Sequence, residues 1–219
     1  METKTKIVKW IGLFFAIVLP VIAATSRLWT HNTNYDFTIW SYILYVLPTL
    51  ILLAIMLFGE KESFSSLGLM NFNLKILGNI GLQMVVCLVV TFIFLNVLNR
   101  MNISSGPEPM YAKIQALPIW GRTLVSFWAG FSEEFAYRGY AITRLQQLTR
   151  SKSAAILIPI ILFGIGHAAN GSLIHVVFAM LIGCVYIAFY MKTKNLLANI
   201  FSHALYDFLF LVVVPVING

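Results

Sequence analysis

The side chains best suited to chemistry in this 219-residue chain lie in its C-terminal half, within segments that are otherwise apolar. They are Glu133, Glu134, Arg138, His167, His203 and Asp207. A carboxylate and two imidazoles around one cavity are suited to activating water, with one group as general base and another as donor to an oxyanion. Glu133, His167 and His203 are equally ordinary ligands of a divalent metal such as zinc. Both routes lead to hydrolysis of an amide.

Helical spacing predicts how these side chains divide their roles. Glu134 and Arg138 stand four residues apart and form an ion pair on one helix face, with Glu133 turned about 100° away towards another surface. His203 and Asp207 also stand four apart, so imidazole and carboxylate share a face. Each segment taken alone also has a purely structural explanation. Glu133, Glu134 and Arg138 could brace a helix bend, and His203 with Asp207 could be a self-contained polar pair.

Depth in the membrane favours the functional interpretation. Glu133 is 17 residues before a turn expected near Arg150, and His167 is 17 after it. Both therefore lie about 25 Å from the turn in an antiparallel helical hairpin. If the stretch 140–152 projects about 10 Å into the membrane–water interface, both residues reach the middle of the apolar core of the membrane. His203 lies about 14 Å beyond a second turn at 192–194. We expect His175, one turn into the next helix, to be structural.

Composition predicts the elements that carry these residues. Hydrophobic residues make up 59% of the chain, charged residues only 11%, and the mean hydropathy is +0.85. No polar stretch is long enough to form a soluble enzyme beside one anchor, and two cysteines in apolar runs exclude a disulfide scaffold and are expected to be buried. We predict an all-α, polytopic transmembrane bundle of about seven spans, a single domain 1–219 with a motif-bearing core at about 117–215. The apolar segments run at 7–24, 39–58, 76–98, 117–137, 154–169, 172–191 and 195–215.

The net charge of +7 is explained by topology rather than by nucleic acid. With a cytoplasmic N-terminus and seven crossings, eleven basic residues fall on the inner side and four on the outer, and the C-terminus lies outside. No basic stripe interleaved with aromatic residues indicates nucleic-acid binding. The inner residues are Lys4, Lys6, Lys9, Lys61, Lys75, Arg138, Arg144, Arg150, Lys152, Lys192 and Lys194; the outer are Arg27, Arg100, Lys113 and Arg122.

The three motifs together resemble the CPBP family of intramembrane proteases, also called the CAAX protease and bacteriocin-processing (Abi) family. Its pattern is Glu-Glu-x-x-x-Arg, then Phe-x-x-x-His, then His-x-x-x-Asn/Asp. Here Glu133-Glu134 precede Arg138, Phe163 precedes His167, and His203 precedes Asp207. The resemblance covers about the last hundred residues, and three motifs in this order on separate helices are far more specific than any one alone.

The resemblance implies an endopeptidase with a cavity open to the cytoplasm, acting on prenylated proteins or on peptides. By position, Glu133 and His167 would activate water, His203 and residue 207 would stabilise the oxyanion, and Glu134 and Arg138 would support the site. An ionised Asp207 cannot donate a hydrogen bond, so we expect it to orient His203. The family has been described both as metal-dependent and as glutamate-dependent, so the cofactor is open: zinc or none.

The partners expected are the lipid bilayer and a peptide or membrane-associated protein. The compact chain resembles bacterial members of the family, so we expect it in a bacterial plasma membrane. Two other classes stay open. One is a non-catalytic immunity or regulatory protein on the same scaffold. The other is a proton-coupled transporter, which would use a buried carboxylate but for which no internal repeat is visible.

Overall fold

The computed structural model describes residues 2–22, 25, 39–69, 74–104, 109–170 and 172–218, and these contain helices but no strand. The helices join into seven rods. They are α1 (Glu2–Leu13) with η1 (Phe14–Val18); α3 (Ile39–Ala54) with η2 (Ile55–Gly59); α4 (Leu74–Arg100); α6 (Ile119–Glu133) with η4 (Glu134–Ala141) and α7 (Ile142–Thr149); α8 (Lys152–Gly166) with η5 (His167–Asn170); α9 (Leu173–Thr193); and α10 (Leu196–Phe208) with η6 (Leu209–Val213) and α11 (Val214–Asn218).

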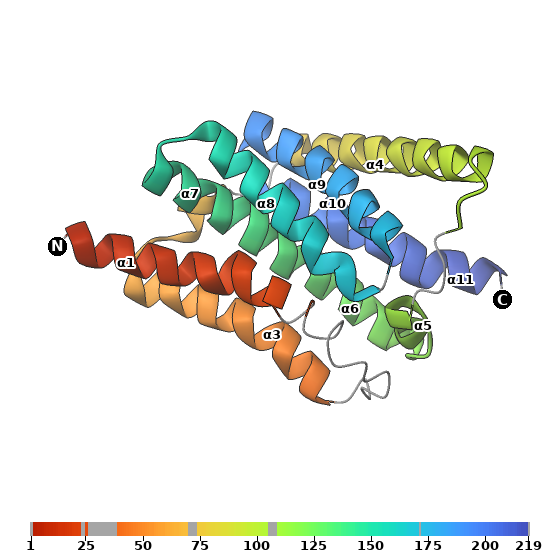
Figure 1. Ribbon diagram of the computed structural model, residues 1–219, viewed down its shortest axis with the longest axis horizontal. Helices are drawn as coiled ribbons and strands as arrows, with labels where there is room; N and C mark the ends of the chain where they lie inside the picture. The colour runs from red at the N-terminus through yellow and green to blue at the C-terminus, as the bar shows by residue number, and fades with distance from the viewer. Residues whose placement is uncertain are drawn as a thin grey trace.

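The rods run side by side along the long axis of the molecule, with the N- and C-termini at opposite ends (Figure 1). Among the described residues, four helices are long and apolar enough to cross a membrane: Thr3–Ile22, Leu74–Arg100, Leu173–Thr193 and Leu196–Ile217. Val46–Gly59 and Lys152–Gly166 are apolar but shorter. The remaining rod, α6–η4–α7, carries Glu133, Glu134 and Arg138. The predicted all-α helical membrane bundle is confirmed.

The rod α6–η4–α7 forms the centre of the bundle. All eight residues of its π-helical stretch η4 are buried, and η4 contacts α8, α9, α10 and η1. A helix that is covered on every side must belong to the core. Phe135 and Tyr140 of η4 accordingly lie in the largest hydrophobic cluster, which also takes residues from α1, α3, α7, α8, α9 and α10. Residues 133–138 are therefore placed by packing from all directions.

A close approach between α6 and α10 sets the register of the central pair. A Cβ atom on Gly130 would lie 2.6 Å from the backbone nitrogen of Ala204 and 2.8 Å from its Cβ. Only a residue without a side chain permits this separation. One turn beyond Gly130, the Glu133 and Glu134 side chains consequently face His203, the neighbour of Ala204 on α10.

Two tight turns reverse the chain at the end of the bundle that carries the N-terminus. Arg150 (φ 55°) ends α7 and Lys194 (φ 52°) ends α9, both in the left-handed conformation typical of helix termini. Each following helix has a side-chain cap, because Ser151 Oγ accepts from Ala154 N and Asn195 Oδ1 accepts from Ala198 N. The turns expected near Arg150 and 192–194 are thus where the sequence predicted them.

Two basic residues counted on the inner side, Arg138 and Arg144, have fully buried side chains, because each pairs with a glutamate in the bundle. For Arg138 this is the internal pair with Glu134 that the sequence predicted. Cys184 is exposed on α9, whereas Cys87 is buried as expected. Arg27 lies outside the described residues.

The loop expected before the fourth span contains a short helix, α5 (Pro109–Gln115). Gln115 Nε2 and Arg122 Nη1 both donate to the carbonyl oxygen of Leu211 in η6, at 3.2 and 3.3 Å. These bonds fix α5 to the end of the bundle opposite the two tight turns.

Replacing Gly130 by leucine will force α6 and α10 apart. Overpacking at a close helix contact costs about 1–3 kcal/mol, so we expect a clearly lower Tm for the detergent-solubilised protein by differential scanning fluorimetry. Gly78→Leu is the matched control, since no atom lies within 4 Å of a Cβ built at Gly78 on α4. Equal melting temperatures for the two variants would contradict the close approach.

Candidate active site

The buried carboxylate of Glu134 is the centre of a hydrogen-bonded network. It forms an ion pair with Arg138 Nη1 at 3.0 Å, and it accepts hydrogen bonds from His203 Nδ1 at 2.9 Å and from Asn199 Nδ2 at 3.1 Å. The Glu134 and Arg138 side chains have no solvent exposure, and that of His203 has 8%. A carboxylate at this depth is stable only when its oxygens are paired, and here both oxygens are.

Arg138 is held between α8 and α9. Its guanidinium lies 4.3 Å from the centre of the Phe163 ring on α8, and Nη2 donates to the carbonyl oxygen of Gly183 on α9 at 3.4 Å. A Cβ atom on Gly183 would lie only 3.2 Å from that nitrogen. The absence of a side chain at 183 therefore lets the guanidinium reach the backbone, and the cation–π contact adds to its support.

His203 presents one ring nitrogen to the protein and the other to two carboxylates. Its ring stacks on Tyr186, with centroids 5.0 Å apart, while Nδ1–H donates to Glu134. Nε2 lies 3.9 Å from Glu133 Oε2 and 3.7 Å from Asp207 Oδ2. Both distances exceed a direct hydrogen bond but lie within the range of an ion pair. Glu133 and Asp207 are 19% and 23% exposed, so this side is the accessible one.

His167 joins the site through Phe163. Its Nδ1–H donates to the Phe163 carbonyl oxygen at 2.8 Å, and its ring lies 4.5 Å from the Phe163 ring, which also contacts Arg138. With Nδ1 used in this way, Nε2 is the acceptor nitrogen. The ring of His175, expected to be structural, lies 5.7 Å from that of His167. The structure thus gathers Glu133, Glu134, His203 and Asp207 into one contact group and adds His167 through an aromatic ring.

Sequence reasoning missed two members of this network. Asn199 donates to Glu134 at 3.1 Å and to the carbonyl oxygen of Tyr186 at 2.8 Å. The ring of Tyr186 stacks against the imidazole of His203. The position of Asn199, four residues before His203, was an available signal. The expected Glu134–Arg138 pair is present, but Glu134 also holds Nδ1 of His203, whereas Asp207 faces Nε2.

The metal expected at Glu133, His167 and His203 stays a prediction. Nδ1 of His203 is used by Glu134, and its Nε2 is 3.7–3.9 Å from the nearest carboxylate oxygens. Among the residues that the structure describes, no three His, Cys, Asp or Glu side chains are grouped to hold an ion.

Comparison with protein families identifies a match in the C-terminal half of the chain. Residues 115–209 match the family model of type II CAAX prenyl endopeptidase Rce1-like proteins. The resemblance to the CPBP family is confirmed over this segment. The match extends from the end of α5 into η6 and contains every residue of the network. No curated protein and no solved structure matches the chain.

Removing Arg138 will leave a buried carboxylate without its cation. We expect Arg138→Met to lower the free energy of unfolding by about 3–5 kcal/mol, measured by denaturant titration in detergent micelles. In the double variant Glu134→Gln/Arg138→Met the charge is gone from both sides, so much of the loss is recovered. Additive single effects would show that the two side chains do not interact.

Proposed function

We propose that this integral membrane protein is an endopeptidase of the CAAX-protease type, with Glu133, His167, His203 and Asp207 as its catalytic residues. The observation that carries the proposal is the orientation of His203. Glu134 holds Nδ1, and Nε2 therefore faces the two partly exposed carboxylates of Glu133 and Asp207. A buried support behind an accessible acid–base group is the arrangement that hydrolysis requires. The match of residues 115–209 supports the same reaction class.

In the proposed reaction, Glu133 accepts a proton from a water molecule as the water oxygen bonds to the carbonyl carbon of the substrate. Its exposed fraction of 19% lets water reach it, and the buried surroundings keep the water positioned. Nε2 of His167 accepts the second hydrogen bond of the same water, since Nδ1–H is used by the Phe163 carbonyl. This division assigns proton transfer to Glu133 and orientation of the water to His167.

The attack places a negative charge on the carbonyl oxygen of the substrate. His203 in its imidazolium form donates from Nε2–H to this oxyanion, while Nδ1–H keeps its bond to Glu134. Asp207 positions the imidazolium from the Nε2 side. When the tetrahedral intermediate collapses, the C–N bond breaks and Glu133 returns its proton to the leaving nitrogen, so that an acid and an amine are released.

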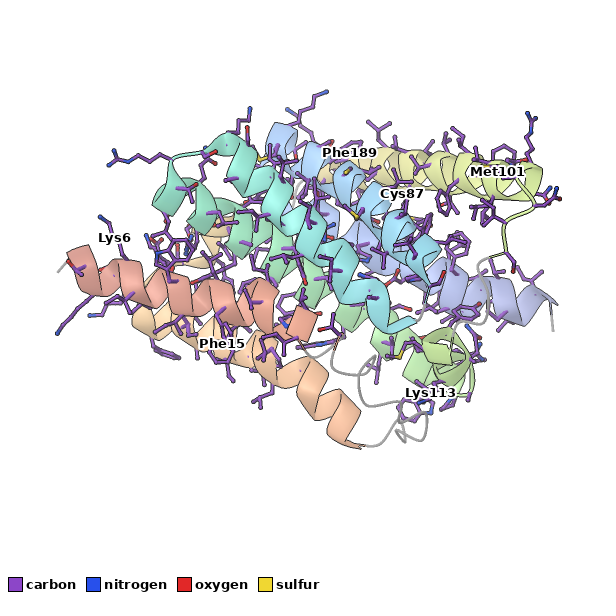
Figure 2. All side chains as sticks on the ribbon, in the orientation of Figure 1. Lys6, Phe15, Cys87, Met101, Lys113 and Phe189 are labelled. Atoms are coloured by element: carbon purple, nitrogen blue, oxygen red, sulfur yellow. The ribbon has the colours of Figure 1, made fainter. Side chains whose placement is uncertain are left out.

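We further propose that the end carrying the N-terminus faces the cytoplasm. The tight turns at Arg150 and Lys194 and the exposed Lys6 and Lys192 lie at this end, as the position of Lys6 in Figure 2 illustrates. Lys113 lies at the opposite end (Figure 2), together with Arg100. An excess of basic residues marks the cytoplasmic side of membrane proteins. The substrate class proposed is a peptide or a membrane-associated protein.

Glu133→Gln keeps the shape of the side chain but removes the base. Since a general base contributes about 10²–10⁴-fold, we expect cleavage to fall by that factor while the protein still inserts and elutes as a folded species. The measurement compares, by mass spectrometry, the peptides in membranes of cells that express the wild-type protein or the variant. Peptide ends present only with the wild-type protein identify the cleavage products.

Glu62→Gln, on the loop after η2, is the matched control, because it removes a carboxylate outside the candidate site. Its peptides should equal those of the wild-type protein. Identical peptides from wild-type and Glu133→Gln cells would overturn the proposed activity. An unchanged cellular phenotype in that case would favour the non-catalytic immunity or regulatory protein on the same scaffold.

Position 207 distinguishes a polar from a purely steric contribution. Asp207→Asn can still face His203 and can also donate a hydrogen bond, so we expect most of the cleavage rate to remain. Asp207→Leu loses both properties and no longer positions His203, so cleavage should fall by about 10²-fold, the scale on which the loss of the oxyanion donor His203 would act. Cleavage of the peptide ends found above is followed with each purified variant. A leucine variant as active as the asparagine variant would exclude Asp207 from the reaction.

A further inference from the structure

An apolar groove lies on the outside of the bundle, away from the candidate active site. It holds about 350 Å³ between α1–η1 on one side and α7–α8 on the other. Among its lining residues, Trp10 and Phe14 of α1–η1 are 52% and 42% exposed, and Ile158 of α8 is 36% exposed. Thr149 is the one lining residue with a polar side chain. The groove therefore has the character of a site for a hydrocarbon chain.

Basic side chains stand at one end of this groove. Lys6 is one helical turn before the lining residue Trp10, and Arg150 directly follows the lining residue Thr149. Lys6 and Arg150 are exposed. Lys9 bridges the two walls, since its Nζ donates to Gln147 Oε1 of α7 at 2.8 Å. Figure 2 shows Lys6 near the start of α1, at the end of the bundle where α7 ends.

Glu60, an acidic residue at this end, is paired inside the bundle and not with the residues at the groove. The Glu60 side chain is fully buried; it accepts from Arg144 Nε at 2.7 Å and from the Tyr140 hydroxyl, and it forms an ion pair with Arg144 Nη2 at 2.7 Å. Arg144 is therefore paired inside the bundle, and the basic residues that adjoin the groove are Lys9 and Arg150.

We propose that this groove binds an anionic phospholipid, with one acyl chain along Trp10, Phe14 and Ile158 and the phosphate at Lys9 and Arg150. Two adjoining features support this occupant: the apolar groove, and the basic residues where the groove ends. A basic pocket between transmembrane helices is a recognised setting for anionic headgroups. An uncharged lipid would use only the apolar part. The inference is independent of the proposed peptidase activity.

The test measures lipid retained by the purified full-length protein. Native mass spectrometry in detergent follows titration with phosphatidylglycerol or phosphatidylcholine of identical acyl chains. We expect at least about fivefold tighter binding of phosphatidylglycerol and a loss of about fivefold for each of Lys9→Gln and Arg150→Gln. Val18→Trp, which fills the groove, should weaken both lipids.

Each variant has a matched control on an exposed site elsewhere. Lys192→Gln removes a charge from the same end of the bundle, in the last turn of α9, and Val89→Trp adds the same bulk to the outer face of α4. Both controls should bind phosphatidylglycerol like the wild-type protein. Equal binding of the two lipids would overturn the proposal, and so would an equal loss with Lys192→Gln. Displacement of phosphatidylglycerol by a prenylated peptide would instead assign the groove to the substrate. Should Val18→Trp fail to fold, the charge variants alone decide.

Discussion

The rest of this structure depends on one interaction, the pairing of the Glu134 carboxylate inside the bundle. An unpaired carboxylate at such a position would cost several kcal/mol, so the fold must bring donors to it. One partner, the ion-paired Arg138, comes from the same rod, and two hydrogen-bond donors, Asn199 and His203, come from α10. The pairing therefore fixes the register of α10 against the central rod. The same bonds set which nitrogen of His203 is left for chemistry.

The surrounding packing serves this register. Gly130 removes the side chain where α6 and α10 meet, and Gly183 does so where the Arg138 guanidinium reaches α9. The π-helical turn η4 begins directly after Glu133, and such turns recur at functional sites because they re-aim side chains within a helix. As a result, buried side chains support His203 on its Nδ1 side. Its Nε2 faces the partly exposed carboxylates of Glu133 and Asp207.

Local patterns predicted much of this arrangement. The pair Glu134–Arg138 and the turn at Arg150 follow from helical spacing and from residues that end helices, which are properties of neighbouring residues. The bond between Glu134 and His203 could not be derived this way, since it depends on how closely two distant helices approach at Gly130. The π-helical geometry of η4 and the short helix α5 were also missed, because both are stabilised by contacts with other rods.

Basic residues show why counting charges along a sequence is an incomplete guide to a membrane protein. Arg138 and Arg144 lie in buried surroundings and pair with Glu134 and Glu60, so they contribute to the core rather than to the membrane surface. Both had been counted on the side that carries the N-terminus, and the remaining basic residues still favour that side over the other. The positive-inside imbalance is therefore unchanged in sign. What changes is the meaning of each charge: the two buried arginines compensate carboxylates, and the exposed residues near Lys9 are left to meet the charge of the lipid.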